Sequence, residues 1–293
     1  MKCFKGFEKD LKCRGFQYEI GKEYEEETAS LCNKGFHACE HPLDVFNYYP
    51  PNEGNRFCEV EIEDTGERSG DDTKVCGTKI KIGAEIGVKG LIKAAFKYTK
   101  ERCTNSEMGG YSSALTGGDS SALTGGNSSA LTGGNSSALT GGNRSALTGG
   151  YSSALTGGNR SALTGGDSSA LTGGDSSALT GGDCSALTGG DCSALTGGYR
   201  SALTGGNRSA LTGGYCSALT GGDSSALTGG DRSVVYGGED AKVRAGKGSV
   251  LALQYWKGFE FKGIKFKEVD GVKIKENTYY KLDKMGRFVE VKD

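Results

Sequence analysis

The sequence predicts a mainly β protein built around a parallel β-solenoid. An eight-residue unit, two variable residues followed by Ser-Ala-Leu-Thr-Gly-Gly, recurs without insertion from Tyr111 to Gly230 in fifteen copies, and a drifted sixteenth ends at Gly238. The four residues between corners, Ser-Ala-Leu-Thr, are too few for a capped helical turn but suffice for a short strand. Gly is abundant (51 residues) but Pro is rare (3). This composition with a strict period argues against collagen and against a disordered linker.

Side chains alternate along a strand, so Leu and the Ser two positions before it should point inward, with Ala and Thr outward. The Gly-Gly pairs should supply positive φ angles at the corners. We predict two octads per coil, hence eight coils in roughly 40 Å. The alternative, three octads per coil, would give a shorter, triangular rod in which Cys192 and Cys216 are stacked neighbours. Three cysteines share one octad position: Cys184, Cys192 and Cys216. Two octads per coil would put the first and last of them two coils apart, about 9–10 Å, so the thiols should be free.

Two smaller regions flank the repeat. We predict that residues 1–103 form an α/β cap domain. Its strands should lie near 2–7, 16–19, 35–39, 56–63 and 79–82. A short helix is expected at 42–49, a polar loop at 66–73 and a longer helix at 88–102. The solenoid should cover 104–254, including degenerate octads at 104–110, 239–246 and 247–254 that close its ends. Residues 255–293 predict an antiparallel β-meander, with a hairpin turn at Asp270-Gly271 between 266–269 and 272–275, and strands 279–282 and 288–291 around a second turn.

Only the first two octad positions vary: the first is Asp, Asn or Tyr, and the second is Ser, Arg or Cys. Tyr and Arg are residue types that dominate binding energy in protein interfaces. The predicted interaction residues are therefore Tyr111, Tyr151, Tyr199, Tyr215, Arg144, Arg160, Arg200, Arg208 and Arg232. The alternative interpretation, neutral drift at solvated corners, stays open.

Candidate chemistry is sparse. Cys32, His37, Cys39 and His41 form the one dense group of ligand-type residues, and alternation could present three of them on one strand face to a metal. The spacing is not that of a standard zinc finger, and a structural role is favoured. Gly-Gly-Asp also resembles calcium β-rolls, but nine of sixteen octads carry Asn or Tyr instead of Asp. We predict no cofactor, and the sequence holds no Ser-His-Asp set, P-loop or dinucleotide fingerprint, so we predict no enzyme.

Charge and targeting signals narrow the partners. The net charge is −1, and the regions 1–110, 111–238 and 239–293 carry −3, −2 and +4. None is basic enough to indicate a nucleic-acid binder. The sequence shows no signal peptide or membrane-spanning apolar run, and its ten cysteines have no framework spacing. We therefore expect a cytoplasmic protein with reduced thiols.

Four segments of the N-terminal region carry recognisable motifs: Lys5–Phe7, Cys13–Glu19, Gly35–Asp44 and Lys74–Gly77. With these motifs and its repeats, the chain resembles an uncharacterised family of bacteriophage and prophage proteins, which have an N-terminal Gly-Phe-His-Ala-Cys domain and short Ser-Ala-containing repeats. The resemblance implies a location in the cytoplasm of a host bacterium but no activity.

We expect a non-enzymatic interaction protein that binds a host protein through its solenoid surface. Counter-defence is one role that such binding could serve. Copies of the protein could also associate with one another along the faces or ends of the solenoid. The alternatives are an ice- or surface-binding solenoid that uses its Thr and Ala ranks, and an N-terminal enzyme with the solenoid as a spacer.

Overall fold

The computed structural model describes residues 1–69, 72–102 and 105–291. The chain divides into two compact units, Met1–Tyr98 and Thr99–Asp293. Two details of the sequence prediction lie outside the described residues, namely the domain boundary between 103 and 104 and positions 70 and 71 of the polar loop.

The first unit is an antiparallel sheet in the order β4-β7-β5-β1-β6. An additional pairing of β6 with β7 closes four of these strands into a small barrel around a core that includes Phe7, Phe36, Val60 and Ile80. The strands are β1 (Lys2–Phe7), β4 (Glu23–Glu25), β5 (Phe36–Cys39), β6 (Arg56–Arg68) and β7 (Lys74–Glu85), and β2 (Lys12–Cys13) with β3 (Phe16–Gln17) forms a separate hairpin.

One of the two helices predicted in the first region differs in type, and the other is confirmed. The segment expected as a helix at 42–49 is the 3-10 helix η1 (Pro42–Asn47), followed by η2 (Pro51–Glu53), while the longer predicted helix is α1 (Gly87–Arg102). Asp44 of η1 is fully buried and accepts hydrogen bonds from Thr73 N–H (3.0 Å) and Thr73 Oγ1 (2.7 Å). Burial raises the pKa of Asp44, but the hydrogen bonds from His41 and Thr73 outweigh it, so the pKa is lowered overall.

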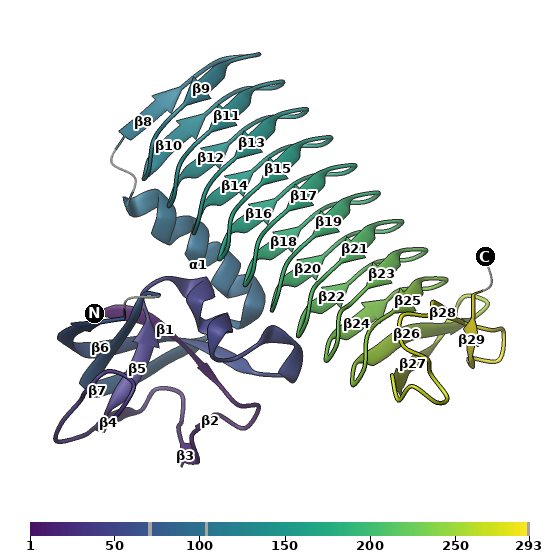
Figure 1. The fold of residues 1–293 in the computed structure, drawn as a ribbon, viewed down its shortest axis with the longest axis horizontal. Helices are drawn as coiled ribbons and strands as arrows, with labels where there is room; N and C mark the ends of the chain where they lie inside the picture. The colour runs from purple at the N-terminus through teal and green to yellow at the C-terminus, as the bar shows by residue number, and fades with distance from the viewer. Residues whose placement is uncertain (70–71, 103–104, 292–293) are drawn as a thin grey trace. The chain divides into compact units, whose positions relative to one another are not determined.

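The repeats form two parallel ladders of short strands (Figure 1). One sheet holds the even-numbered strands β8 (Asn105–Met108), β10 (Ser121–Thr124), β12 (Ala138–Thr140), β14 (Ala154–Thr156), β16 (Ala170–Thr172), β18 (Ala186–Thr188), β20 (Ala202–Thr204), β22 (Ala218–Thr220), β24 (Val234–Gly237) and β26 (Val250–Lys257). The other holds β9 (Ala114–Thr116), β11 (Ala130–Thr132), β13 (Ala146–Thr148), β15 (Ala162–Thr164), β17 (Ala178–Thr180), β19 (Ala194–Thr196), β21 (Ala210–Thr212), β23 (Ala226–Thr228) and β25 (Lys242–Arg244).

Strand register confirms two octads per coil. Ala122 pairs with Ala138, sixteen residues later, and Ala130 pairs with Ala146 in the other sheet. The degenerate octads at both ends also contribute strands (β8, β25 and β26), so the described residues make about nine coils rather than the predicted eight.

The interior of the solenoid follows the predicted alternation. From Leu123 to Leu227 every octad Leu is at most 1% exposed, and the octad Ser residues between them are buried as well. Each buried hydroxyl finds a carbonyl in the coil before it, as in the 3.2 Å bond from Ser193 Oγ to Gly174 O. On the odd-numbered sheet, Ala and Thr of β11 to β21 are exposed, as predicted. The core is therefore a Leu column flanked by hydroxyls whose hydrogen bonds are satisfied.

The prediction for the glycines is wrong in its reason. The positive φ angles lie at the second octad position, from +53° to +62° in all sixteen octads, and not at the Gly-Gly pairs. The glycines are needed for space instead. A Cβ on Gly133 would lie 2.6 Å from Ser137 Cβ, and one on Gly142 would lie 2.8 Å from the Asn127 backbone nitrogen of the coil before it. Close packing of the chain at each corner, rather than left-handed backbone, excludes a side chain there.

The C-terminal region reverses strand direction at the last coil. β27 (Glu260–Glu268) pairs antiparallel with β26, and β28 (Tyr280–Leu282) pairs antiparallel with β25 and with β29 (Phe288–Glu290). The predicted hairpin around Asp270-Gly271 is wrong, because residues 272–275 form no strand. Asp270 Oδ1 instead accepts three consecutive backbone N–H groups, from residues 272 to 274, which coils the chain into a compact turn. Within the described residues, no helix is long and apolar enough to cross a membrane.

Candidate functional site

The first variable octad position carries a hydrogen-bond ladder that runs along the solenoid. Asp119 Oδ1 accepts the backbone N–H of Asn135 at 2.7 Å, and Asn127 Oδ1 accepts that of Asn143 at 2.8 Å, each one coil later. All seven Asp and all five Asn residues at this position make the same bond, at 2.7–3.0 Å. Asp and Asn are interchangeable here because both place an oxygen at Oδ1.

The four octads that begin with Tyr interrupt this ladder. A phenol carries no oxygen near its own backbone, so it cannot accept the N–H one coil later. The rungs without a side-chain acceptor are those above Tyr111, Tyr151, Tyr199 and Tyr215. Each substitution gives up a hydrogen bond whose net contribution is about 0.5–1.5 kcal/mol. The first position is therefore not a free surface position, since Tyr weakens the scaffold where it stands.

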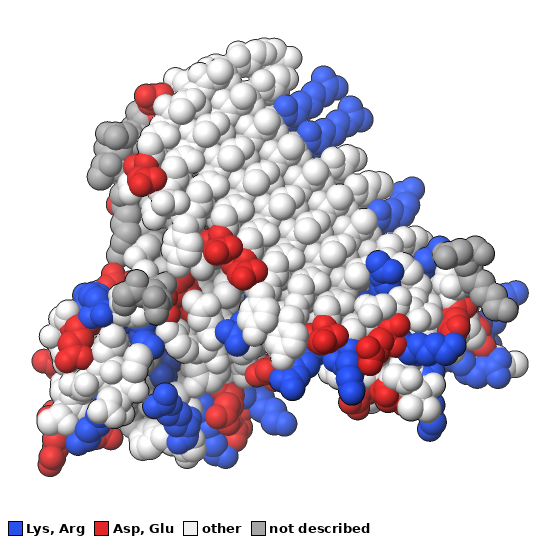
Figure 2. Space-filling view, viewed as in Figure 1, with Lys and Arg blue, Asp and Glu red and all other residues white. Residues whose placement is uncertain are grey.

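The nine predicted interaction residues do not form one surface. Residues sixteen apart stack in the same ladder, so the corners before odd-numbered strands make one edge of the solenoid and the corners before even-numbered strands make the other. The odd edge carries Tyr111, Arg144, Arg160 and Arg208, whereas the even edge carries Tyr151, Tyr199, Arg200, Tyr215 and Arg232. Figure 2 shows basic side chains along one edge of the solenoid, beside a broad face with little charge.

Four residues of the even edge form one group, which we call the tyrosine–arginine cluster: Tyr199, Arg200, Tyr215 and Arg232. The rings of Tyr199 and Tyr215 stack with centroids 5.1 Å apart and planes 6° from parallel. Arg200 Cζ lies 4.7 Å from the centroid of the first ring, and Arg232 Cζ lies 5.8 Å from that of the second. The cluster is a preorganised aromatic and cationic surface on a rigid backbone.

The edge at Tyr151 differs, because another part of the same unit lies beside it. Thr99 Oγ1, in the last turn of α1, donates a 3.2 Å hydrogen bond to the carbonyl of Ser152. Ser152 precedes Arg200 by three coils, each about 4.8 Å high, so this contact lies away from the tyrosine–arginine cluster.

The cysteines agree with two octads per coil. All three repeat cysteines are free thiols; Cys192 is exposed on the odd edge, whereas Cys184 and Cys216 are buried at the even edge, two coils apart.

Among the four weak metal candidates, the two histidine side chains make other hydrogen bonds. His37 Nε2 accepts the Cys32 backbone N–H at 3.0 Å, while His41 lies beyond the end of β5 and bonds through Nδ1 to Asp44 Oδ1 at 3.3 Å. Burial raises the pKa of the Cys39 thiol well above its usual value. No three His, Cys, Asp or Glu side chains in the described part of the chain are placed to hold one metal ion. The alternation that suggested a shared face ends at Cys39, where the strand gives way to η1.

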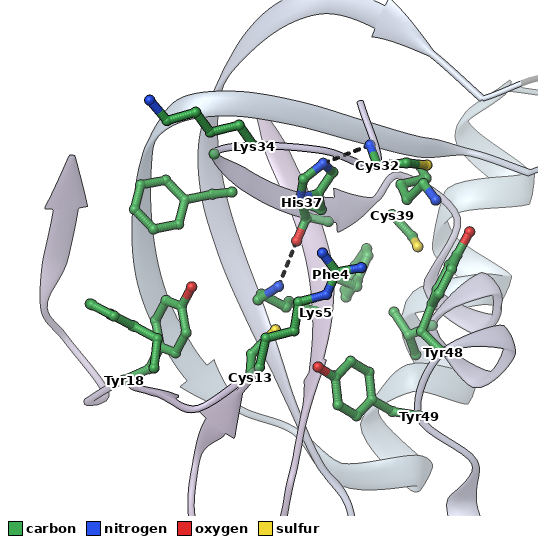
Figure 3. Close-up of a pocket in the computed structure, with 18 of the residues that line it drawn as sticks. Phe4, Lys5, Cys13, Tyr18, Cys32, Lys34, His37, Cys39, Tyr48 and Tyr49 are labelled. Carbon is green, nitrogen blue, oxygen red and sulfur yellow. Dashed lines mark hydrogen bonds between the residues drawn. The ribbon is translucent and has the colours of Figure 1, made fainter. Parts of the chain in front are cut away.

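The first unit contains a cavity that the sequence prediction missed. It has a volume of about 590 Å³ and is bordered by β1, β5, η1 and the segments around Cys13 and Tyr18 (Figure 3). Lys5 of β1 lies among its lining residues and is only 6% exposed. The signal available in the sequence was a Lys inside the otherwise apolar strand Cys-Phe-Lys-Gly-Phe.

Comparisons with known proteins identify the region that holds this cavity. Residues 1–94 match the profile of a family described as a domain of unknown function (DUF7666). The chain thus carries an N-terminal DUF7666 domain followed by a β-solenoid. The four N-terminal motifs of the phage-family resemblance lie inside the DUF7666 domain, and the short repeats on which it also rests lie outside it. No curated protein and no solved structure is significantly similar to the chain.

Proposed function

We propose that this protein is a non-enzymatic interaction protein whose solenoid binds a partner protein through the tyrosine–arginine cluster. Following the resemblance to phage and prophage proteins, the proposed partner is a protein of the bacterial host, and interference with host defence is the proposed consequence. Self-association through the solenoid ends or faces is part of the same proposal.

The observation that carries this proposal is the stacked pair of Tyr199 and Tyr215 with an arginine on each ring. Tyr at these octads gives up ladder hydrogen bonds that Asn or Asp makes in the other twelve. Stacking offsets part of that loss, by about 0.5–1.5 kcal/mol. Tyr and Arg held together on a rigid surface are the groups that most often dominate protein interfaces.

The test replaces cluster residues with the repeat's own alternatives. In Tyr199→Asn/Tyr215→Asn the ladder acceptors return, so the fold should be retained. The matched control is Arg144→Ser/Arg160→Ser on the odd edge, which also uses the repeat's own residue. The immobilised full chain and both variants are exposed to bacterial lysate, and captured proteins are quantified by mass spectrometry.

We expect a specific partner to be captured by the unaltered protein and the control, and at least about tenfold less by the cluster variant. Equal capture by all three proteins would contradict the proposal, and loss only with the arginine variant would move the interface to the odd edge.

A second candidate function rests on the outer face of the odd-numbered sheet. Thr132, Thr148, Thr164 and the corresponding Thr of β17 to β21 are exposed and in parallel register, next to an equally regular rank of Ala. Regular hydroxyl and methyl spacing suits a repetitive surface such as ice. Thermal hysteresis of the purified protein tests this, with Thr148→Lys/Thr164→Lys as the variant that should abolish it; no hysteresis from the unaltered protein removes this candidate.

The enzymatic alternative, an active N-terminal domain with the solenoid as spacer, stays a prediction without an assigned catalytic group.

A further inference from the structure

The cavity of the DUF7666 domain combines a buried cation with aromatic walls. Its Phe and Tyr lining residues are Phe4, Phe16, Tyr18, Phe36, Tyr48 and Tyr49. Figure 3 shows Tyr18 and Tyr49 on opposite sides of the Lys5 side chain. A cavity of about 590 Å³ lies in the range of small-molecule sites.

Lys5 is the unusual group of this cavity. Its Nζ donates a 2.8 Å hydrogen bond to the carbonyl of His37 and lies 5.9 Å from the ring centroid of Tyr18. Within the described part of the chain it forms no salt bridge with a carboxylate. Burial lowers the pKa of Lys5, which reflects the energy of holding an ammonium away from water. A buried ammonium without a carboxylate is stabilised by any anion that enters beside it.

The remaining charges of the lining also favour an anion. Arg14, Lys34 and Lys74 join Lys5 as cations, against two acids, Glu8 and Glu26, so the formal net charge is +2. His37 adds no positive charge near neutral pH, because burial lowers its pKa below the usual value. Lys74 lies 4.6 Å from the Tyr48 ring centroid, so a second cation of the lining contacts an aromatic ring.

We propose that this cavity binds a small organic anion whose charged group lies at Lys5 and whose flat ring packs against the aromatic lining residues. The charge requirement comes from the buried ammonium of Lys5, which has no carboxylate partner among the described residues, and the ring requirement comes from the aromatic walls. This site is independent of the tyrosine–arginine cluster, because every residue that lines it lies within the first 74 positions.

The experiment compares anions with neutral molecules of the same shape. The full chain is titrated by isothermal calorimetry with adenosine monophosphate and with benzoate, and in parallel with adenosine and with benzyl alcohol. We expect at least one anion to bind, and its neutral partner to bind at least about tenfold more weakly, as the loss of a charge-assisted hydrogen bond implies.

Two variants assign the effect to the cavity. Lys5→Met keeps the side-chain length and should weaken anion binding by about 10- to 100-fold, whereas Lys89→Met, an exposed lysine of α1 outside the cavity, should leave it unchanged. If Lys5→Met does not fold, Arg14→Met at the cavity lining takes its place, with a smaller expected loss. The proposal is overturned if neither anion binds, if anion and neutral partner bind equally, or if Lys89→Met weakens binding as much as the cavity variant does.

Discussion

Replacing one glycine of the repeat tests the packing argument most directly. Gly142 faces Asn127 of the preceding coil, and an added Cβ would lie 2.8 Å from the Asn127 backbone nitrogen and against its side-chain Oδ1. That Oδ1 accepts the Asn143 N–H at 2.8 Å. In Gly142→Ala the coils have to separate locally and the ladder bond is lost or lengthened.

The expected magnitude follows from three contributions. Loss of the ladder bond destabilises by about 0.5–1.5 kcal/mol. Displacing tightly packed backbone adds about 1–3 kcal/mol. The reduced conformational freedom of the unfolded chain returns about 0.4–1 kcal/mol. The net destabilisation of Gly142→Ala should therefore be roughly 0.5–4 kcal/mol.

The first coil supplies the matched control. Gly118 occupies the same octad position, but a Cβ there would meet no atom within 4 Å. Gly118→Ala should consequently be neutral or stabilise by up to about 1 kcal/mol. Urea unfolding of the full chain, followed by far-UV circular dichroism, measures both, and hydrogen exchange locates any local opening. Equal stabilities of the two variants would refute the packing argument, and so would evidence that Gly118→Ala is the weaker of them.

Three further outcomes follow from buried groups. Leu171→Ala should destabilise by about 2.7–5 kcal/mol in urea unfolding, because the side chain is fully buried in the Leu column; a loss below about 1 kcal/mol would contradict that packing. A brief alkylation should modify the exposed Cys192 well before the buried Cys184 or Cys216, as measured by mass spectrometry. A disulfide between repeat cysteines would contradict two octads per coil. Asp44→Asn should lower the free energy of unfolding at pH 7. The difference from the unaltered protein should shrink as the pH falls below 3.8, because a carboxyl group with a lowered pKa stabilises the fold only while it is ionised. A difference in unfolding free energy that grows in acid would contradict the lowered pKa of Asp44.

The architecture of the solenoid could be predicted from the sequence, because the eight-residue period and the Leu position in each octad can be read from it directly. The sixteen-residue register follows once Leu points inward and two octads close a coil. The reason for Gly-Gly was not accessible in the same way. Glycine is favoured both by a positive φ angle and by close packing of the backbone, and the sequence does not distinguish these two reasons. The structure shows that the positive φ lies at Arg144, whereas Gly142 is required because the chain is crowded there.

The candidate site was less accessible, because its parts come together through the fold. Tyr199 and Tyr215 are sixteen residues apart, and only the two-octad coil makes them stacked neighbours. The cavity around Lys5 unites side chains from separated segments of the DUF7666 domain, so no local spacing could indicate it. The weak metal candidates are kept apart for the opposite reason. Local alternation placed His37 and His41 on one face, but the strand ends between them.

The ladder changes what variation at the octad corners means. At the second position, Ser, Arg and Cys all adopt the same left-handed backbone, so a change among them leaves the backbone of the corner as it is. It alters the surface where the position is exposed, as at Arg144 and Cys192. At the first position, Asp and Asn maintain a hydrogen bond that Tyr cannot make. Replacing Tyr199 by Asn therefore acts in opposite directions on the two properties of interest. It should maintain or raise the stability of the solenoid, and by our proposal it should weaken partner binding. A variant that binds less while folding as well separates the role of this tyrosine in recognition from its role in the scaffold.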